Sequence, residues 1–220
     1  MSEEVLINVT PTETRVAVVE NGMLQEVSLE RNSYLGYLGN IYKGTVSRVL
    51  PGMQAAFIDI GLDRTAFLHA SDIYRFTDEQ MPDDPPPEPS INSLVREGES
   101  VVVQVIKDPL GTKGARLTTH LSIPSRFLVL LPHSETIAVS LRIEDDAERN
   151  RLKGLVATMR EHKGGHGYII RTNAENINEF ALSADMTYLA KIWESIAEQT
   201  KVSSPGAVSY THLTLPTITE

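Results

Sequence analysis

Hydrophobic and polar residues alternate between positions 41 and 69, and this alternation predicts three short β-strands. Pro51-Gly52 and Gly61 separate the three runs, as expected of turns. Successive side chains in a strand point to opposite faces of a sheet. The second and third runs therefore divide into an apolar face, formed by Ala56, Ile58, Ile60, Ala66 and Leu68, and a more polar face, which carries Phe57, Asp59, Phe67 and His69.

The two phenylalanines on the more polar face are the first candidate site. Aromatic rings displayed on a sheet beside basic residues can stack on the bases of single-stranded nucleic acid. Lys113 lies on the predicted turn before the last strand, close to a glycine on each side, and its ammonium could contact a phosphate there. Lys43 and Arg116 are further candidates. The alternative that Phe57 and Phe67 fill a second apolar core stays open at this point.

The region around these residues is typical of an OB-type barrel. Three strands in residues 41–69 are followed by a helical turn at 70–74, an acidic, proline-rich loop at 76–92 and a short helix at 91–96. A buried strand at 100–106, a turn at 108–114 and a last strand at 115–119 complete the pattern. Five strands with one short helix between the third and the fourth are the layout of that barrel.

The flanking segments predict an α+β protein. Residues 4–30 read as three strands with a hairpin turn at Asn21-Gly22, and this small sheet is expected to pack on later chain. After residue 124, strands are predicted at 127–131, 136–139 and 168–170, and helices at 145–161 and 176–200. The stripe predicted to be buried on the second helix consists of Phe180, Leu182, Met186, Leu189, Ile192, Trp193 and Ile196.

Arg171-Thr172, at the end of the predicted strand 168–170, is the second candidate site. A guanidinium fork and a hydroxyl suit the oxygens of a terminal phosphate, although such a pair is weak support by itself. The six histidines show no spacing typical of metal ligands, and no phosphate-binding glycine loop, serine-histidine pair or convincing carboxylate pair is present.

Composition narrows the class of protein. The 220 residues are 41% hydrophobic, enough for a packed core, and contain no cysteine for disulfides or thiolate zinc sites. The net charge of −9 argues against a general nucleic-acid coat, but leaves room for a local basic face. No long apolar run or export signal is visible, so we expect a cytoplasmic protein with no membrane partner.

Residues 208–217 resemble the translated reading of a sequencing adaptor, so residues 208–220 are left out of the fold prediction. We expect the native sequence to continue differently beyond about residue 207. A genuine C-terminal tail is the alternative.

Several long motifs resemble the RNase E/G family. They occupy residues 6–11, 40–61, 66–72, 103–119 and 170–172, and the resemblance extends over residues 1–207. It implies four segments: the first part of an RNase H-like subdomain at 1–38, an S1 (OB-fold) RNA-binding domain at 39–120, a 5′-sensor subdomain at 121–202, and a linker with a non-native tail at 203–220.

The resemblance also implies a function and site residues. Phe57, Phe67 and Lys113 match the family's RNA-contacting residues. Arg171 and Thr172, with the backbone near Val129, match the family's residues that bind a 5′-monophosphate. The family consists of Mg²⁺-dependent endoribonucleases that cleave single-stranded RNA in rRNA maturation and mRNA decay and form homodimers. DNA is not an expected partner.

Two departures from the family pattern affect this expectation. Leu141 stands where a related pattern has an arginine, so Arg142 is the only sensor contact expected from that strand. The family's catalytic aspartates and its dimer-linking cysteine pair are not found, so we expect no catalytic residue, no bound metal and no cleavage by this chain. A non-catalytic S1 RNA-binding module and an assembly role, in which the first hairpin pairs across chains, are the alternatives.

Overall fold

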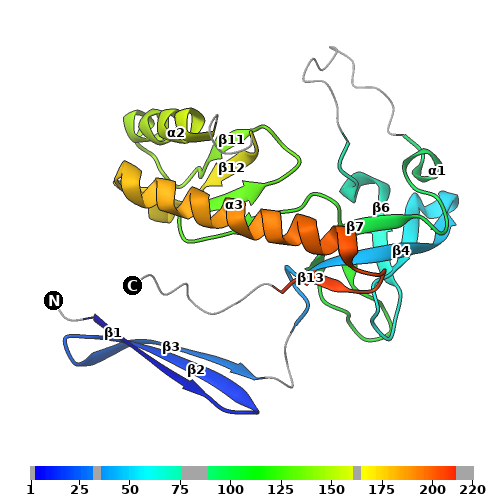
Figure 1. Cartoon of the computed structure of the whole chain (residues 1–220), viewed down its shortest axis with the longest axis horizontal. Coiled ribbons are helices and arrows are strands. Elements are labelled where there is room, and N and C mark those ends of the chain that lie inside the picture. The colour runs from blue at the N-terminus through cyan, green and yellow to red at the C-terminus, as the bar shows by residue number, and fades with distance from the viewer. Residues whose placement is uncertain (1–2, 32–35, 76–88, 161–164, 212–220) are drawn as a thin grey trace. The chain divides into compact units, whose positions relative to one another are not determined.

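The computed structural model describes residues 3–31, 36–75, 89–160 and 165–211, so most of the predicted loop at 76–92 lies outside the described residues. The described residues divide into two compact units, one that ends at Tyr37 and one that extends from Leu38 to Thr211 (Figure 1). No helix in the described part of the chain is both long enough and apolar enough to cross a bilayer.

The first unit is a three-stranded antiparallel sheet. Its strands are β1 (Glu3–Val9), β2 (Glu13–Glu20) and β3 (Met23–Arg31), in the order β1-β2-β3. Asn21 and Gly22 both have positive φ, at 49° and 78°, so the predicted hairpin turn is confirmed. Large apolar side chains remain exposed on this sheet, including Leu6, Ile7, Val9, Met23, Leu24, Val27 and Leu29.

The second unit begins with the predicted barrel, which is confirmed. Five strands follow one another around it in the order β4-β5-β6-β8-β7, and β7 pairs again with β4 to close it (Figure 1). All pairs are antiparallel except β6 with β8. The elements are β4 (Ile41–Leu50), β5 (Ala55–Asp59), β6 (Ala66–His69), α1 (Ile91–Leu94), β7 (Ser100–Lys107) and β8 (Arg116–Thr118).

The barrel interior is filled by the predicted apolar face. Ala56, Ile58, Ala66 and Leu68 are all fully buried, and so is Leu117 from β8. They form one core cluster with apolar residues of β4 and β7. The period-two alternation therefore assigned these residues to the buried face correctly, although Ala55, on the same face as Phe57, is fully buried too.

The rest of the second unit is a four-stranded sheet packed with two helices. The strand order is β11-β12-β10-β9, with β11 parallel to β12 and the other pairs antiparallel. Figure 1 shows α2 and α3 beside this sheet, and their apolar residues join its core cluster. The elements are β9 (Ile123–Pro124), β10 (Leu128–Leu131), β11 (Ile137–Val139), α2 (Asp146–Arg160), β12 (Gly167–Ile170) and α3 (Glu179–Val202).

Two expectations about this part differ from the structure. Phe180 is not part of the buried stripe of α3 but is 84% exposed, because it lies in the first turn, outside the row that faces the sheet. Residues 208–210, which the sequence argument left out of the fold, form a strand, β13 (Val208–Tyr210), that pairs with β4. Strand β9 was not predicted.

A row of aromatic rings joins the barrel to the second sheet. The Tyr74 ring lies 5.5 Å from that of His120 and 5.7 Å from that of His133. Trp193 of α3 lies 5.6 Å from His133 and 6.3 Å from His166. Burial, and to a lesser extent the nearby His166, lowers the pKa of His133 below 6.5. The ring cluster therefore favours an uncharged His133.

This lowered pKa predicts that acid destabilises the ring cluster. The unfolded chain takes up a proton at His133 more readily than the folded chain, so the stabilising contribution is present above pH 6.5 and is lost as the pH falls below that value. Urea unfolding at pH 7.5 and at pH 5.5 measures the loss. His133→Gln is expected to show a smaller difference between the two pH values, because it has no imidazole at this position to take up a proton. An equal difference in both proteins would contradict this assignment.

Candidate nucleic-acid interface

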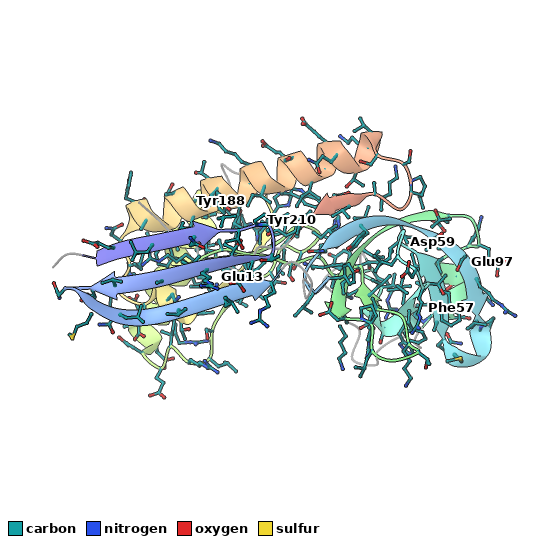
Figure 2. All side chains as sticks on the ribbon, turned by 90° about the horizontal axis from the view of Figure 1, so that it is seen from below. Glu13, Phe57, Asp59, Glu97, Tyr188 and Tyr210 are labelled. Atoms are coloured by element: carbon teal, nitrogen blue, oxygen red, sulfur yellow. The ribbon has the colours of Figure 1, made fainter. Side chains whose placement is uncertain are left out.

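Phe57 and Phe67 form an aromatic pair on the outer side of the barrel. They occupy directly opposite positions on β5 and β6, with ring centroids 6.3 Å apart in an edge-to-face arrangement. Both side chains are only partly buried, and neither belongs to a core cluster. Phe57 is seen on the barrel in Figure 2. The open alternative, that the two rings fill a second core, does not describe this arrangement.

Arginines flank the aromatic pair on both sides. In the register of the sheet, Arg48 of β4 lies opposite Phe57, and Arg116 of β8 lies opposite Phe67. One row across four strands thus reads Arg48, Phe57, Phe67, Arg116. We call this row the barrel platform. Two rings between two cations suit single-stranded nucleic acid, because its bases can stack on the rings while its phosphates lie near the cations.

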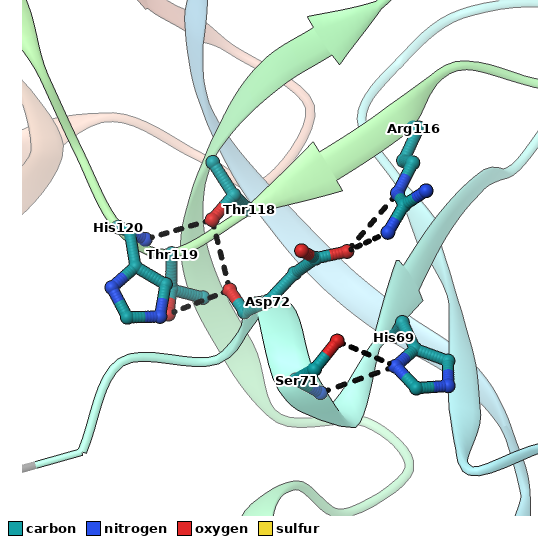
Figure 3. Close-up of polar contacts among 7 residues, drawn as sticks. All are labelled: His69, Ser71, Asp72, Arg116, Thr118, Thr119 and His120. Atoms are coloured by element: carbon teal, nitrogen blue, oxygen red, sulfur yellow. Dashed lines mark hydrogen bonds and ion pairs between the residues drawn. The ribbon is translucent and has the colours of Figure 1, made fainter.

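A polar network fixes one edge of the barrel platform (Figure 3). Arg116 donates from Nε and Nη2 to Asp72 Oδ2, at 3.1 and 2.9 Å. The carbonyl of Asp72 accepts from the Thr118 hydroxyl at 2.9 Å, which ties the 3₁₀ turn of residues 70–72 to β8. Because Asp72 holds Arg116 at two nitrogens, the guanidinium beside Phe67 has a defined direction.

His69 adds a third ring next to Phe67. The two ring centroids are 6.4 Å apart with an angle of 31° between the planes. The backbone N–H of Ser71 donates to His69 Nδ1 at 3.2 Å (Figure 3). This hydrogen bond makes Nδ1 an acceptor, so in the neutral ring the proton is on Nε2.

Lys113 lies in a tight turn that is pressed against the barrel. Its backbone exchanges hydrogen bonds with Leu110, at 3.0 and 3.1 Å, and its side chain is exposed. A Cβ at Gly114 would lie 2.0 Å from the carbonyl oxygen of Thr65, just before β6. Only glycine permits this approach, so the backbone proximity expected beside Lys113 is present.

Lys43, a further candidate at the sequence level, has another role. Its ammonium donates to the carbonyl oxygens of Thr200 and Ser203, at 2.9 Å each. These carbonyls lie at the C-terminal end of α3, where a cation is favourable. Lys43 therefore connects β4 to the end of α3 and is not part of the barrel platform.

Arg171 and Thr172 follow β12 directly, as predicted. The Arg171 backbone N–H donates to the carbonyl of Phe127 at 2.8 Å, and its guanidinium donates to the carbonyl of Ser125. Thr172 begins a 3₁₀ turn that ends at Ala174. Arg171 is exposed and Thr172 is partly buried. Both can therefore be reached by a ligand from solvent.

The other residues considered for the phosphate site lie on a neighbouring strand and in the turn after β11. Val129 of β10 pairs with Ile169 of β12, two residues before Arg171. Leu141 is 89% exposed, and Arg142 beside it is exposed too, in the turn that follows β11. The sheet thus brings Val129 and Arg171 together, although 42 positions separate them in the chain.

Helix α2 holds the chain just after the 3₁₀ turn of residues 172–174. Glu148 accepts from the backbone N–H of Asn176 at 2.8 Å and from Arg151, which also donates to the carbonyl of Ile177 at 3.0 Å. The hydrogen bond from Arg151 lowers the pKa of Glu148, although burial acts in the opposite direction. A charged Glu148 therefore holds this turn in place above the acid range.

Three residues of this interface were missed by sequence reasoning. Arg48 was missed because a bulge between Val46 and Arg48 shifts the β4 register, and alternation alone does not reveal a bulge. Asp72 was read only as part of a helical turn. His69 shares its strand face with Phe67, which the alternation did show, but a search for metal ligands gave it no role.

The described residues contain no group of three or more His, Cys, Asp or Glu side chains that could hold a metal ion. They do not fit the Mg²⁺ site implied for the family, and we assign this metal no residues here.

Comparison with known proteins agrees with both parts of the second unit. Residues 38–119 match the S1 RNA binding domain, and residues 122–218 match the Ribonuclease E/G family. Ribonuclease G of Escherichia coli K12 is 52% identical over 203 residues, and that of Salmonella typhimurium is 53% identical over the same length. Ribonuclease E of a Nostoc species is 35% identical over 193 residues.

These matches cover most of this chain but less than half of each relative. The alignments include 91% of this chain and 41% of either ribonuclease G, and 87% of this chain and 27% of the Nostoc ribonuclease E. With a closed S1 barrel followed in sequence by a region that matches the family model, the chain belongs to the ribonuclease E/G family.

Proposed function

We propose that this chain is the RNA-binding and 5′-monophosphate-sensing part of an endoribonuclease of the ribonuclease G type. The observation that carries the proposal is the barrel platform, where Phe57 and Phe67 lie side by side between Arg48 and Arg116. Stacking on aromatic rings tolerates any base, and cations beside the rings attract the backbone. Single-stranded RNA is thus the ligand that this surface suits.

The second element of the proposal is a phosphate site at the end of β12. The Arg171 guanidinium has five N–H donors, of which the described contacts use one. The Thr172 hydroxyl and the backbone near Val129 lie on adjoining segments. A terminal monophosphate offers several acceptor oxygens and two negative charges, which distinguishes it from an internal phosphodiester.

For the whole protein we propose the remaining properties that the family resemblance implies. These are Mg²⁺-dependent cleavage of single-stranded RNA in rRNA maturation and mRNA decay, a homodimer, and a cytoplasmic location. Residues 1–38 are proposed as the first part of an RNase H-like subdomain, and residues 121–202 as the 5′-sensor subdomain. The family match over residues 122–218 favours this reading over an isolated S1 module.

The test compares two AU-rich oligonucleotides that differ only at the 5′ end. Fluorescence anisotropy gives one Kd for the 5′-monophosphate form and one for the 5′-hydroxyl form, and their ratio is the 5′-phosphate preference. Arg171→Ala is expected to lower this preference by about tenfold or more, because a charged hydrogen bond contributes about 1.5–3 kcal/mol. Affinity for the 5′-hydroxyl form should change little, since the barrel platform is intact.

Lys153→Ala is the control, because Lys153 is an exposed cation of α2 that lies outside the loop that contacts Arg171. It should keep most of the preference. A wild-type chain that binds both oligonucleotides equally well would refute the 5′-phosphate site, and a chain that binds neither would refute RNA binding altogether.

A further inference from the structure

The loop between β9 and β10 is held by one carboxylate oxygen from α3. Asp185 Oδ2 accepts from the Ser125 hydroxyl at 2.6 Å and from the backbone N–H groups of Phe127 and Leu128, both at 3.0 Å. Hydrogen bonds to a charged acceptor are stronger than those between neutral groups. Three of them on one oxygen determine the shape of residues 125–128.

The same loop positions Arg171. The carbonyl of Ser125 accepts from the Arg171 guanidinium, and the carbonyl of Phe127 accepts from the Arg171 backbone N–H at 2.8 Å. Two residues that donate to Asp185 therefore also accept from Arg171. If Ser125 and Phe127 move, both the backbone and the guanidinium of Arg171 lose their support.

The loop also leads directly to Val129, the residue of β10 in the proposed phosphate site. Leu128, the third donor to Asp185, is the first residue of β10, and Val129 follows it. Ser125 is 5% exposed, and its N–H donates to the carbonyl of Leu128 at 2.8 Å, which closes the loop on itself. Asp185 thus holds residues 125–128, which contact Arg171 and lead directly to Val129.

From these contacts we infer that Asp185 is a positioning residue for the 5′-monophosphate site, which it does not itself touch. The inference rests on the proposed function, since it assigns Asp185 to the Arg171 site. Asp185 lies on the sheet-facing side of α3, three residues after Leu182 and four before Leu189, which are both fully buried. An acid in such a row is unfavourable unless it is hydrogen-bonded, which explains the tight contacts with the loop.

The test measures the 5′-phosphate preference of the full 220-residue chain with the same two oligonucleotides. Asp185→Ala is expected to lower the preference at least about threefold, because the Arg171 guanidinium is no longer held in one direction. The Kd for the 5′-hydroxyl oligonucleotide should stay within about twofold, since that RNA depends on the barrel platform. Ser125→Ala, a milder change, should lower the preference by about twofold.

The matched control is Glu194→Gln, which removes an exposed negative charge from the same helix and should leave the preference unchanged. If Arg171→Ala abolishes the preference but Asp185→Ala and Ser125→Ala retain it, the positioning role is wrong. If both affinities fall equally in Asp185→Ala, the residue only stabilises the fold, and the inference is also wrong. If Asp185→Ala does not fold, Ser125→Ala decides between these results by itself.

If Arg171→Ala leaves the preference intact, the proposed phosphate site itself is at fault. This outcome is distinct from the previous ones, because it does not depend on Asp185.

Discussion

Replacing both Phe57 and Phe67 with alanine is expected to weaken binding of single-stranded RNA by about 30-fold or more. Each ring lost removes stacking on the order of 1–3 kcal/mol per base, and the two rings lie opposite each other on β5 and β6. Each single variant should lose roughly half of this free energy. Anisotropy titrations with an AU-rich 5′-hydroxyl oligonucleotide measure the effect without a contribution from a terminal phosphate.

Phe180→Ala provides the control for this experiment. Phe180 is another phenylalanine, 84% exposed at the start of α3 and outside the barrel, so its loss should leave RNA affinity unchanged. Circular dichroism of each variant checks that the barrel is intact. Unchanged affinity in a folded Phe57, Phe67 double variant would mean that RNA does not use the barrel platform.

Gly114→Ala is expected to destabilise the barrel by about 1–3 kcal/mol. A Cβ at this position would lie 2.0 Å from the carbonyl oxygen of Thr65. The atoms nearest to it all belong to the backbone, so no flexible side chain can move away to make room. The turn that carries Lys113 would have to separate from the start of β6. The free energy of unfolding, from urea titration, measures this cost, and RNA affinity should fall with it.

Gly154→Ala is the matched control for this second prediction. Gly154 lies within α2, and an added Cβ there has nothing within 4 Å. Alanine should therefore raise stability by about 0.5–1 kcal/mol, because it is the better helix former. If Gly114→Ala were as stable as the wild type, the turn would not be packed against Thr65 in solution.

Local pattern was enough to predict most of the barrel. A side-chain period of two distinguished Phe57 and Phe67 from Ala56, Ile58 and Leu68, and the structure has the same division. The predicted helix start near residue 145 was also correct: α2 begins at Asp146, and the Asp145 carboxylate accepts from the Ala147 N–H at 2.9 Å. These features depend on neighbours a few positions away in the chain, which a sequence displays directly.

The features that could not be predicted depend on partners far away in the chain. Lys43 meets carbonyls about 160 positions later, and Asp185 meets a loop about 60 positions earlier. The sequence around neither residue identifies its partner, because only the packed fold brings each residue and its partner together. The roles of Phe57, Phe67, Lys113, Val129, Arg171 and Thr172 in binding RNA stay predictions, which the variants above test.

The row of rings from Tyr74 to Trp193 has a consequence for the length of RNA that this chain can grip. The row and the bridge from Lys43 to α3 couple the barrel to the second sheet within one compact unit. On the proposed function, an RNA that binds both the barrel platform and Arg171 has to reach from one to the other. An oligonucleotide too short to reach both places binds only one of them at a time. A plot of affinity against nucleotide number should therefore show a step.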